Sequence, residues 1–167
     1  MTDQTTARWA MPLLAPGQAG KELTHNEALA LLDMLVQPAV EAVGTDVPPT
    51  APVAGRCWIV GSAPTGAWAG HAGALAGWTD GGWRFVAPVE GLAAWCISSA
   101  KPVAYRNGVW QEGDVVAARV VVAGRQVVGP QAGAIATPAG GDVVDAQVRT
   151  AVAEILAALR QHGLIAA

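Results

Sequence analysis

The side chains that could perform chemistry are few and scattered along the chain. His25, His71 and His162 are the only histidines, and the one metal-like spacing, Glu22 with His25, is too common a pair to indicate a site. We therefore expect no metal ion. His71 differs from the other two because it lies in the glycine-rich stretch 68–73, which predicts a loop. Loops carry binding residues more often than strands do.

Nucleophiles and phosphate-binding loops are equally hard to find. Ser62, Ser98 and Ser99 are the only serines, and none lies in a Gly-x-Ser-x-Gly turn. The glycine-rich stretch 66–77 lacks the lysine that a phosphate-binding loop requires. The paired carboxylates Asp142 and Asp145 have a spacing that suits the start of a helix. The sequence thus predicts no catalytic residue, no cofactor and no enzymatic activity.

Composition narrows the classes of partner. Ten basic and thirteen acidic residues without a basic cluster argue against a nucleic-acid partner. Hydrophobic residues make up 52% of the chain, yet no run is long enough to span a membrane. We expect part of this apolar surplus in subunit interfaces, and hence a homo-oligomer. The start of the chain lacks the charged and apolar regions of a signal peptide, which predicts synthesis in the cytoplasm.

Tryptophan is the most informative residue type. Six of the seven tryptophans lie between Trp58 and Trp110. Such a set either fills a compact β core or forms a surface that stacks on flat, amphipathic ligands such as sugars. Trp58 and Trp95 lie in apolar runs beside Cys57 and Cys96, so all four are expected in core strands, the cysteines as buried free thiols. For sugar contact the candidates are Trp68, His71, Trp78 and Trp110.

Two segments precede the Trp-rich region. Residues 1–23 contain prolines among apolar residues and predict an extended arm that covers a partner surface. Thr24 and Glu27 form a capping box that opens a helix over 24–43, with Pro38 ending or kinking it.

The remaining sequence predicts a β domain over 44–130, a loop over 131–144 and a helix over 145–167. Turns are expected at 79–82, at Asn107-Gly108 and at 123–125, where glycine admits tight hairpins. Asp142 or Asp145 would cap the last helix and Gly163 would end it. The predicted fold is mainly β, a small antiparallel sandwich or barrel of hairpins, with one N-terminal and one C-terminal α-helix.

Two apolar patches are suited to assembly contacts between chains. One is on the arm and the other is a stripe at helical spacing on the last helix. Their residues are Trp9, Met11, Leu13, Leu14, Val148, Val152, Ile155 and Leu159.

Three stretches resemble a known family. The motif from Met11 to Ala28 resembles the opening of an uncharacterised domain family of phage tail-fibre-like and gene transfer agent proteins. The Trp-rich body from Thr65 to Tyr105 is similar to the same family, and the end from Val127 to Ile165 resembles the tail of such particle proteins. Members are often longer and carry extra receptor-binding segments, whereas the resemblance seen here covers only the core domain and the tail.

The resemblance implies a structural role on a particle. The similar short protein of gene transfer agents is the base of a head spike, which implies capsid protein at five-fold vertices and a spike or fibre protein as partners, a homopentamer, and a location on the particle head. A different class of function stays open, in which exposed tryptophans make the chain a carbohydrate-binding module or adhesin for host capsule polysaccharide.

Overall fold

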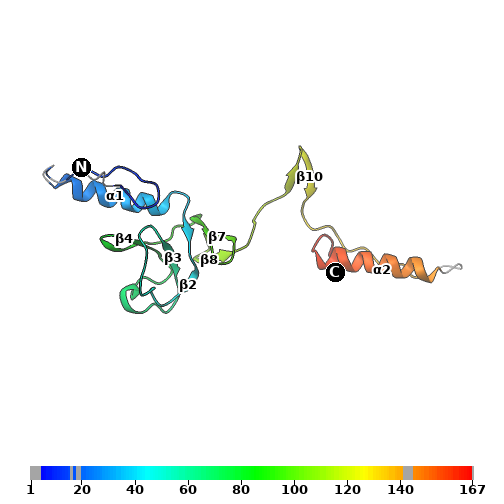
Figure 1. Cartoon of the computed structure of the whole chain (residues 1–167). Coiled ribbons are helices and arrows are strands. Elements are labelled where there is room, and N and C mark those ends of the chain that lie inside the picture. The colour runs from blue at the N-terminus through cyan, green and yellow to red at the C-terminus, as the bar shows by residue number, and fades with distance from the viewer. Residues whose placement is uncertain (1–4, 16, 18–19, 141–144, 167) are drawn as a thin grey trace. The chain divides into compact units, whose positions relative to one another are not determined.

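The computed structural model describes residues 5–15, 17, 20–140 and 145–166 (Figure 1). The chain divides into two compact units, Met1–Asp114 and Val115–Ala167, which we call the first and second units. The β domain expected over 44–130 therefore ends earlier, because the hairpin after residue 114 groups with the C-terminal helix. The expected class is confirmed: ten strands form three sheets, with one helix toward each end of the chain.

Helix α1 spans Lys21–Leu35, so both boundaries expected from the sequence were wrong. Gly20 is the N-cap with a φ of 79°, and Thr24 lies inside the helix rather than capping it. The helix stops before Pro38, because Gln37 takes the left-handed backbone with a φ of 45°. The residues that follow form two short strands, so strand structure begins before residue 44, within the segment expected as helix.

Two four-stranded sheets make up the rest of the first unit. One has the order β1-β6-β7-β8, with bounds Ala39–Val40, Ala93–Cys96, Lys101–Arg106 and Val109–Glu112. The other has the order β2-β3-β4-β5, with bounds Val43–Thr45, Cys57–Val60, Leu75–Thr79 and Gly82–Val86. A short 3-10 helix, η1, spans Gly66–Trp68 between β3 and β4. Each sheet begins with a parallel pair, β1 with β6 and β2 with β3, which an arrangement of hairpins alone does not contain.

The hairpins lie where the turn chemistry placed them. Trp78 pairs with Trp83 across the β4–β5 turn. Asn107 and Gly108 both have positive φ, 52° and 79°, as a tight hairpin turn between β7 and β8 requires. These turns set the registers of β4 with β5 and of β7 with β8, in which Leu75 and Val103 are core residues.

One apolar core joins α1 to both sheets. It contains Met34 from α1 together with strand residues that are at most 3% exposed: Val40, Cys57, Ile59, Leu75, Cys96 and Val103. A second cluster of Val60, Trp68 and Ala76 carries Trp58, Trp83 and Phe85 around it. Both cysteines are buried free thiols, as expected. Trp95 is not in the core: it is 48% exposed, because its neighbour Cys96 takes the inward position and successive strand residues face opposite sides.

The second unit contains a hairpin and a helix. Strand β9 is Val120–Val122 and β10 is Arg125–Val128, so the β-branched run from Val115 forms a strand only at its end. Helix α2 spans Ala146–Gln161, and the Asp145 side chain accepts a hydrogen bond from the Val148 amide, which confirms it as the cap. Asp142 lies outside the described residues. After the helix, Ile165 pairs with Ala132 in a parallel bridge.

Candidate functional site

Most of the tryptophan side chains pack against one another instead of facing solvent. Trp68, which is 0% exposed, lies with its ring centroid 5.1 Å from that of Trp83 and 6.2 Å from that of Trp58. Trp78 contacts Trp83 edge to face at 5.0 Å. These tilted arrangements are the favoured geometry of aromatic pairs in a core. Trp68 therefore has no exposed ring, and its assignment as a sugar contact was wrong.

His71 and Trp110, two further candidates for sugar contact, hold the glycine-rich loop to the sheets. The His71 ring stacks on Phe85 with centroids 3.6 Å apart and planes 4° apart. The indole Nε1 of Trp110 donates to the Gly73 carbonyl at 2.8 Å. Both rings are thus engaged within the chain, and among the four candidates Trp78 alone lines the groove described next.

A groove of about 290 Å³ lies in the first unit between the arm, α1 and the β4–β5 hairpin. Its walls combine apolar side chains such as Leu13, Met34 and Trp78 with polar ones. The polar lining includes Asn26, Glu27, Asp33, Asp80 and Arg84. A concave, partly apolar surface with a few convergent polar groups is the usual form of a binding site.

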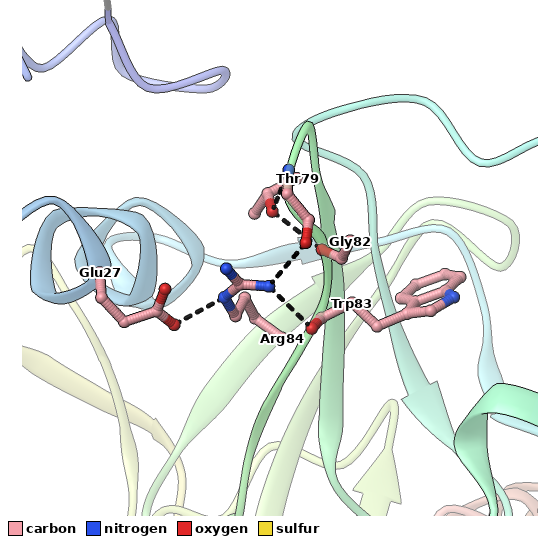
Figure 2. Close-up of polar contacts among 6 residues, drawn as sticks. Glu27, Thr79, Gly82, Trp83 and Arg84 are labelled. Atoms are coloured by element: carbon pink, nitrogen blue, oxygen red, sulfur yellow. Dashed lines mark hydrogen bonds and ion pairs between the residues drawn. The ribbon is translucent and has the colours of Figure 1, made fainter. Parts of the chain in front are cut away.

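Arg84 links the α1 wall of the groove to the wall formed by the β4–β5 hairpin (Figure 2). Its Nε donates to Glu27 Oε1 at 2.6 Å, and one terminal nitrogen donates to the carbonyls of Gly81 and Trp83 at 3.2 and 3.1 Å. Thr79 closes the same turn by donating its hydroxyl to the Gly82 carbonyl at 2.8 Å. The planar guanidinium thus ties the hairpin to α1 through several donors at once, which a lysine could not reproduce.

The arm is anchored on α1 by a buried carboxylate. Asp33, 5% exposed, accepts hydrogen bonds from the Thr6 hydroxyl at 2.7 Å and from the amides of Arg8 and Trp9 at 2.8 Å each. A buried carboxylate requires such partners, since its desolvation is otherwise costly. The extended arm expected over 1–23 is therefore folded back on its own subunit across its described residues.

Arg8 completes the other end of that contact. Its guanidinium donates to the carbonyls of Asp33 at 2.6 Å and Gln37 at 2.9 Å, at the C-terminal end of α1. The last turn of α1 has no basic residue of its own, so Arg8 supplies the favourable positive charge from outside the helix. The sequence signal that we missed is Asp33 itself, an acid inside the apolar run Leu31–Leu35.

The pKa values of the two cysteine thiols are shifted in opposite directions. Burial raises the pKa of the Cys57 thiol to about 11, although the Arg8 guanidinium opposes that shift. Burial also acts to raise the pKa of Cys96, but hydrogen bonds with Ser98 and Ser99 bring it below its ordinary value.

Within the described residues no group of three potential metal ligands lies close together. No helix among those residues has the length and apolar character to cross a membrane.

A protein family of unknown function, DUF2793, matches residues 25–111, just over half of the chain. The chain belongs to this family. Among curated proteins, none matches it. The DUF2793 region runs from within α1 to within β8, so it contains the hairpin wall of the groove and, apart from Leu23, the helix wall. The arm residues Thr5–Leu14 and the whole second unit lie outside it.

The residues predicted for assembly differ in their surroundings. On the arm, Trp9 is 47% exposed and donates its indole Nε1 to the Val36 carbonyl, while Met11, Leu13 and Leu14 are half-buried. On α2, Val148 and Ile155 are exposed, and Val152 and Leu159 are half-buried. The stripe on α2 therefore leaves apolar surface exposed for a partner. Much of the apolar surface of the arm is instead packed against α1.

Proposed function

We propose that this DUF2793 chain is a structural component of a phage-like particle, a gene transfer agent, and forms the head-spike base. In this role it attaches to capsid protein at five-fold vertices as a homopentamer and anchors a spike or fibre protein on the head surface. The resemblance of its opening, Trp-rich and closing stretches to such particle proteins supports the proposal. It is a binding role, and we propose no enzymatic activity.

The observation that carries the proposal is the contrast between the two units. Among the residues that the structure describes, fourteen hydrophobic ones are buried: twelve lie in the first unit and only Leu156 and Ile165 lie in the second. The second unit exposes valines on both strands of its hairpin and on α2. Large apolar surfaces left open on a soluble protein mark interaction sites. A first unit with its own core, joined to a second unit with exposed apolar surface, is the arrangement that an adaptor protein needs.

The experiment is to locate the chain in the particle. Particles would be purified from the strain that encodes it and from a strain lacking its gene, and the two maps compared by cryo-electron microscopy. We expect density for five copies at each head vertex, absent without the gene. Three copies on the tail, or particles that lack the chain, would contradict the proposal.

A second candidate, a carbohydrate-binding module, is favoured by one observation. Trp78 lines the groove together with Asn26, Asp80 and Arg84, which combines an aromatic ring with hydrogen-bonding groups suited to a sugar. Glycan-array binding that is lost in Trp78→Ala and kept in Trp95→Ala would support this function. Trp95 is a matched control because it is exposed and does not line the groove. No binding to capsule polysaccharides would exclude it.

A further inference from the structure

The apolar stripe of α2 has the spacing of a helix-bundle seam. Val148, Val152, Ile155 and Leu159 are separated by four, three and four residues, which places them at alternating d and a positions of a heptad. The two d residues, Val148 and Ile155, are 56% and 59% exposed. Leu156, on a neighbouring face, is the buried residue of the helix. Helix α2 therefore packs within its own unit through the face of Leu156, which leaves the a residues Val152 and Leu159 half-buried and the d residues exposed.

The row beside the seam is also suited to a close neighbour. Ala151 and Ala158 occupy the g positions, where long charged side chains would otherwise separate two helices. The opposite face carries Thr150, Glu154 and Ala157, all exposed. The helix thus has exposed apolar residues along the row of Val148, Ala151, Ile155 and Ala158, and an exposed opposite face suited to water.

The hairpin of the second unit adds to this surface. Every residue of β9 and β10 is exposed, and consecutive valines place apolar side chains on both faces of the ribbon. A two-stranded hairpin is marginal in water when it packs against nothing. The ribbon therefore needs partner surface on its faces, and α2, with little more than two heptads, needs additional contacts for a stable bundle.

The exposed area is of the size that a stable interface requires. Eleven large aliphatic residues of the second unit are 41–81% exposed: Val115, Val116, Val120, Val121, Val122, Val127, Val128, Ile135, Val148, Ile155 and Leu164. At roughly 60–120 Å² of apolar surface for each fully exposed side chain, they offer on the order of 400–700 Å². Apolar atoms form about 60% of an interface, so this corresponds to one standard interface, in which each partner buries approximately 800 Å², and in a ring each copy divides it between two neighbours.

We propose that the second unit binds the same unit of at least two further copies of this chain, with the α2 helices side by side and parallel. β-branched residues at d positions disfavour two-stranded bundles and favour larger ones. A cyclic ring of three or more copies relates its helices by rotation about one axis, so they point the same way. The proposal rests on the particle role above, for which it specifies the contacts between copies, and of the two patches expected from the sequence it assigns self-association to the α2 stripe and not to the arm.

The first test measures the mass of the full chain by sedimentation. We expect at least three times the 17.0 kDa of one chain. Val148→Glu with Ile155→Glu should give 17.0 kDa monomers, because both charges lie on the seam. Ala157→Glu, the same charge on the opposite face, should keep the oligomer. A wild-type monomer or dimer, or an oligomer that survives the double substitution, would overturn the proposal.

The chain carries its own control for folding of the first unit. All seven tryptophans lie at or before residue 110, so near-ultraviolet circular dichroism and tryptophan fluorescence report on the first unit alone. Both signals should be unchanged in the double variant. Changed signals together with a monomeric mass would place the self-contacts in the first unit and contradict the proposal.

A second test avoids disruptive charges. In a parallel bundle, oxidation by added oxidised glutathione should link Val148→Cys by a disulfide to the same residue of a neighbouring copy, and Leu159→Cys likewise. The native Cys57 and Cys96 are buried and give little background. Disulfides that form only in a mixture of the two variants would show antiparallel helices and refute the arrangement. A solution oligomer absent from particles would refute the head-spike role alone, whereas monomers that decorate particles would refute this inference alone.

Discussion

The buried carboxylate of Asp33 gives the sharpest prediction about the first unit. Asp33→Ala removes three charge-assisted hydrogen bonds, from the Thr6 hydroxyl and from the amides of Arg8 and Trp9. Such bonds contribute about 1.5–3 kcal/mol each. The two amides lie in partly exposed surroundings and regain water when the arm opens, so we take the lower end and expect a loss of about 3–5 kcal/mol in arm docking.

Trypsin cleavage after Arg8 measures this loss directly. In the folded arm the Arg8 guanidinium donates to carbonyls at the end of α1, so cleavage requires the arm to open. When opening is fast, the cleavage rate follows the open population, and each 1.4 kcal/mol changes it about tenfold. Asp33→Ala should therefore accelerate cleavage by a factor on the order of 10²–10³.

Two comparisons make the result specific to the carboxylate. Asp33→Asn keeps an oxygen for the two donors at Oδ1 but sets an NH₂ group against the Arg8 amide, so one bond is lost and about tenfold faster cleavage is expected. Leu32→Ala, a neighbouring exposed position, should leave the rate unchanged. The reasoning fails if Asp33→Ala is cleaved at the wild-type rate, or if wild-type protein is cleaved as fast as an unfolded chain.

Three other substitutions test the fold. Thr24→Ala should change the free energy of unfolding by less than about 0.5 kcal/mol, because Thr24 lies inside α1; a loss near 1 kcal/mol in urea denaturation would restore the capping role. Trp68→Ala should cost about 3–5 kcal/mol in the same assay and the half-exposed Trp95→Ala much less, and equal costs would contradict the burial described above. Because the Cys57 pKa is raised in the folded state to about 11, the unfolded thiol ionises first, so stability should fall as pH rises from 9 to about 11. Cys57→Ala should flatten that part of the pH profile, and an unchanged slope would exclude Cys57 as its cause.

The features predicted correctly from the sequence are those set by neighbouring residues. Asn107-Gly108 predicts its hairpin because both residues tolerate positive φ, and Asp145 predicts its cap because a carboxylate reaches the free amides of the next turn. The features that were missed depend on distant partners. The parallel pairing of Val43–Thr45 with β3 has no local signal, and short apolar strands do not reveal which of two neighbours, Trp95 or Cys96, faces the core.

The same dependence on distant partners explains why the contacts of the candidate site were not predicted from the sequence. Asp33 and Arg8 are 25 residues apart, so their contact follows from the return of the arm and not from either local pattern. Arg84 lies 57 residues from Glu27, and nothing near it in the sequence marks it as the link between α1 and the hairpin. Trp78 and Trp68 were both candidates for sugar contact. Only the structure shows that Trp78 lines the groove, whereas Trp68 lies in the core.

The short segment Ala39–Thr45 has a consequence for aggregation. It supplies β1 at the edge of one four-stranded sheet and β2 at the edge of the other, and these strands are only two and three residues long. An edge so short offers too few free backbone groups to template a foreign strand. Amyloid-like extension of the first unit would therefore have to begin at the opposite edges, β5 or β8, and point substitutions there are where misassembly should first emerge during production of the protein.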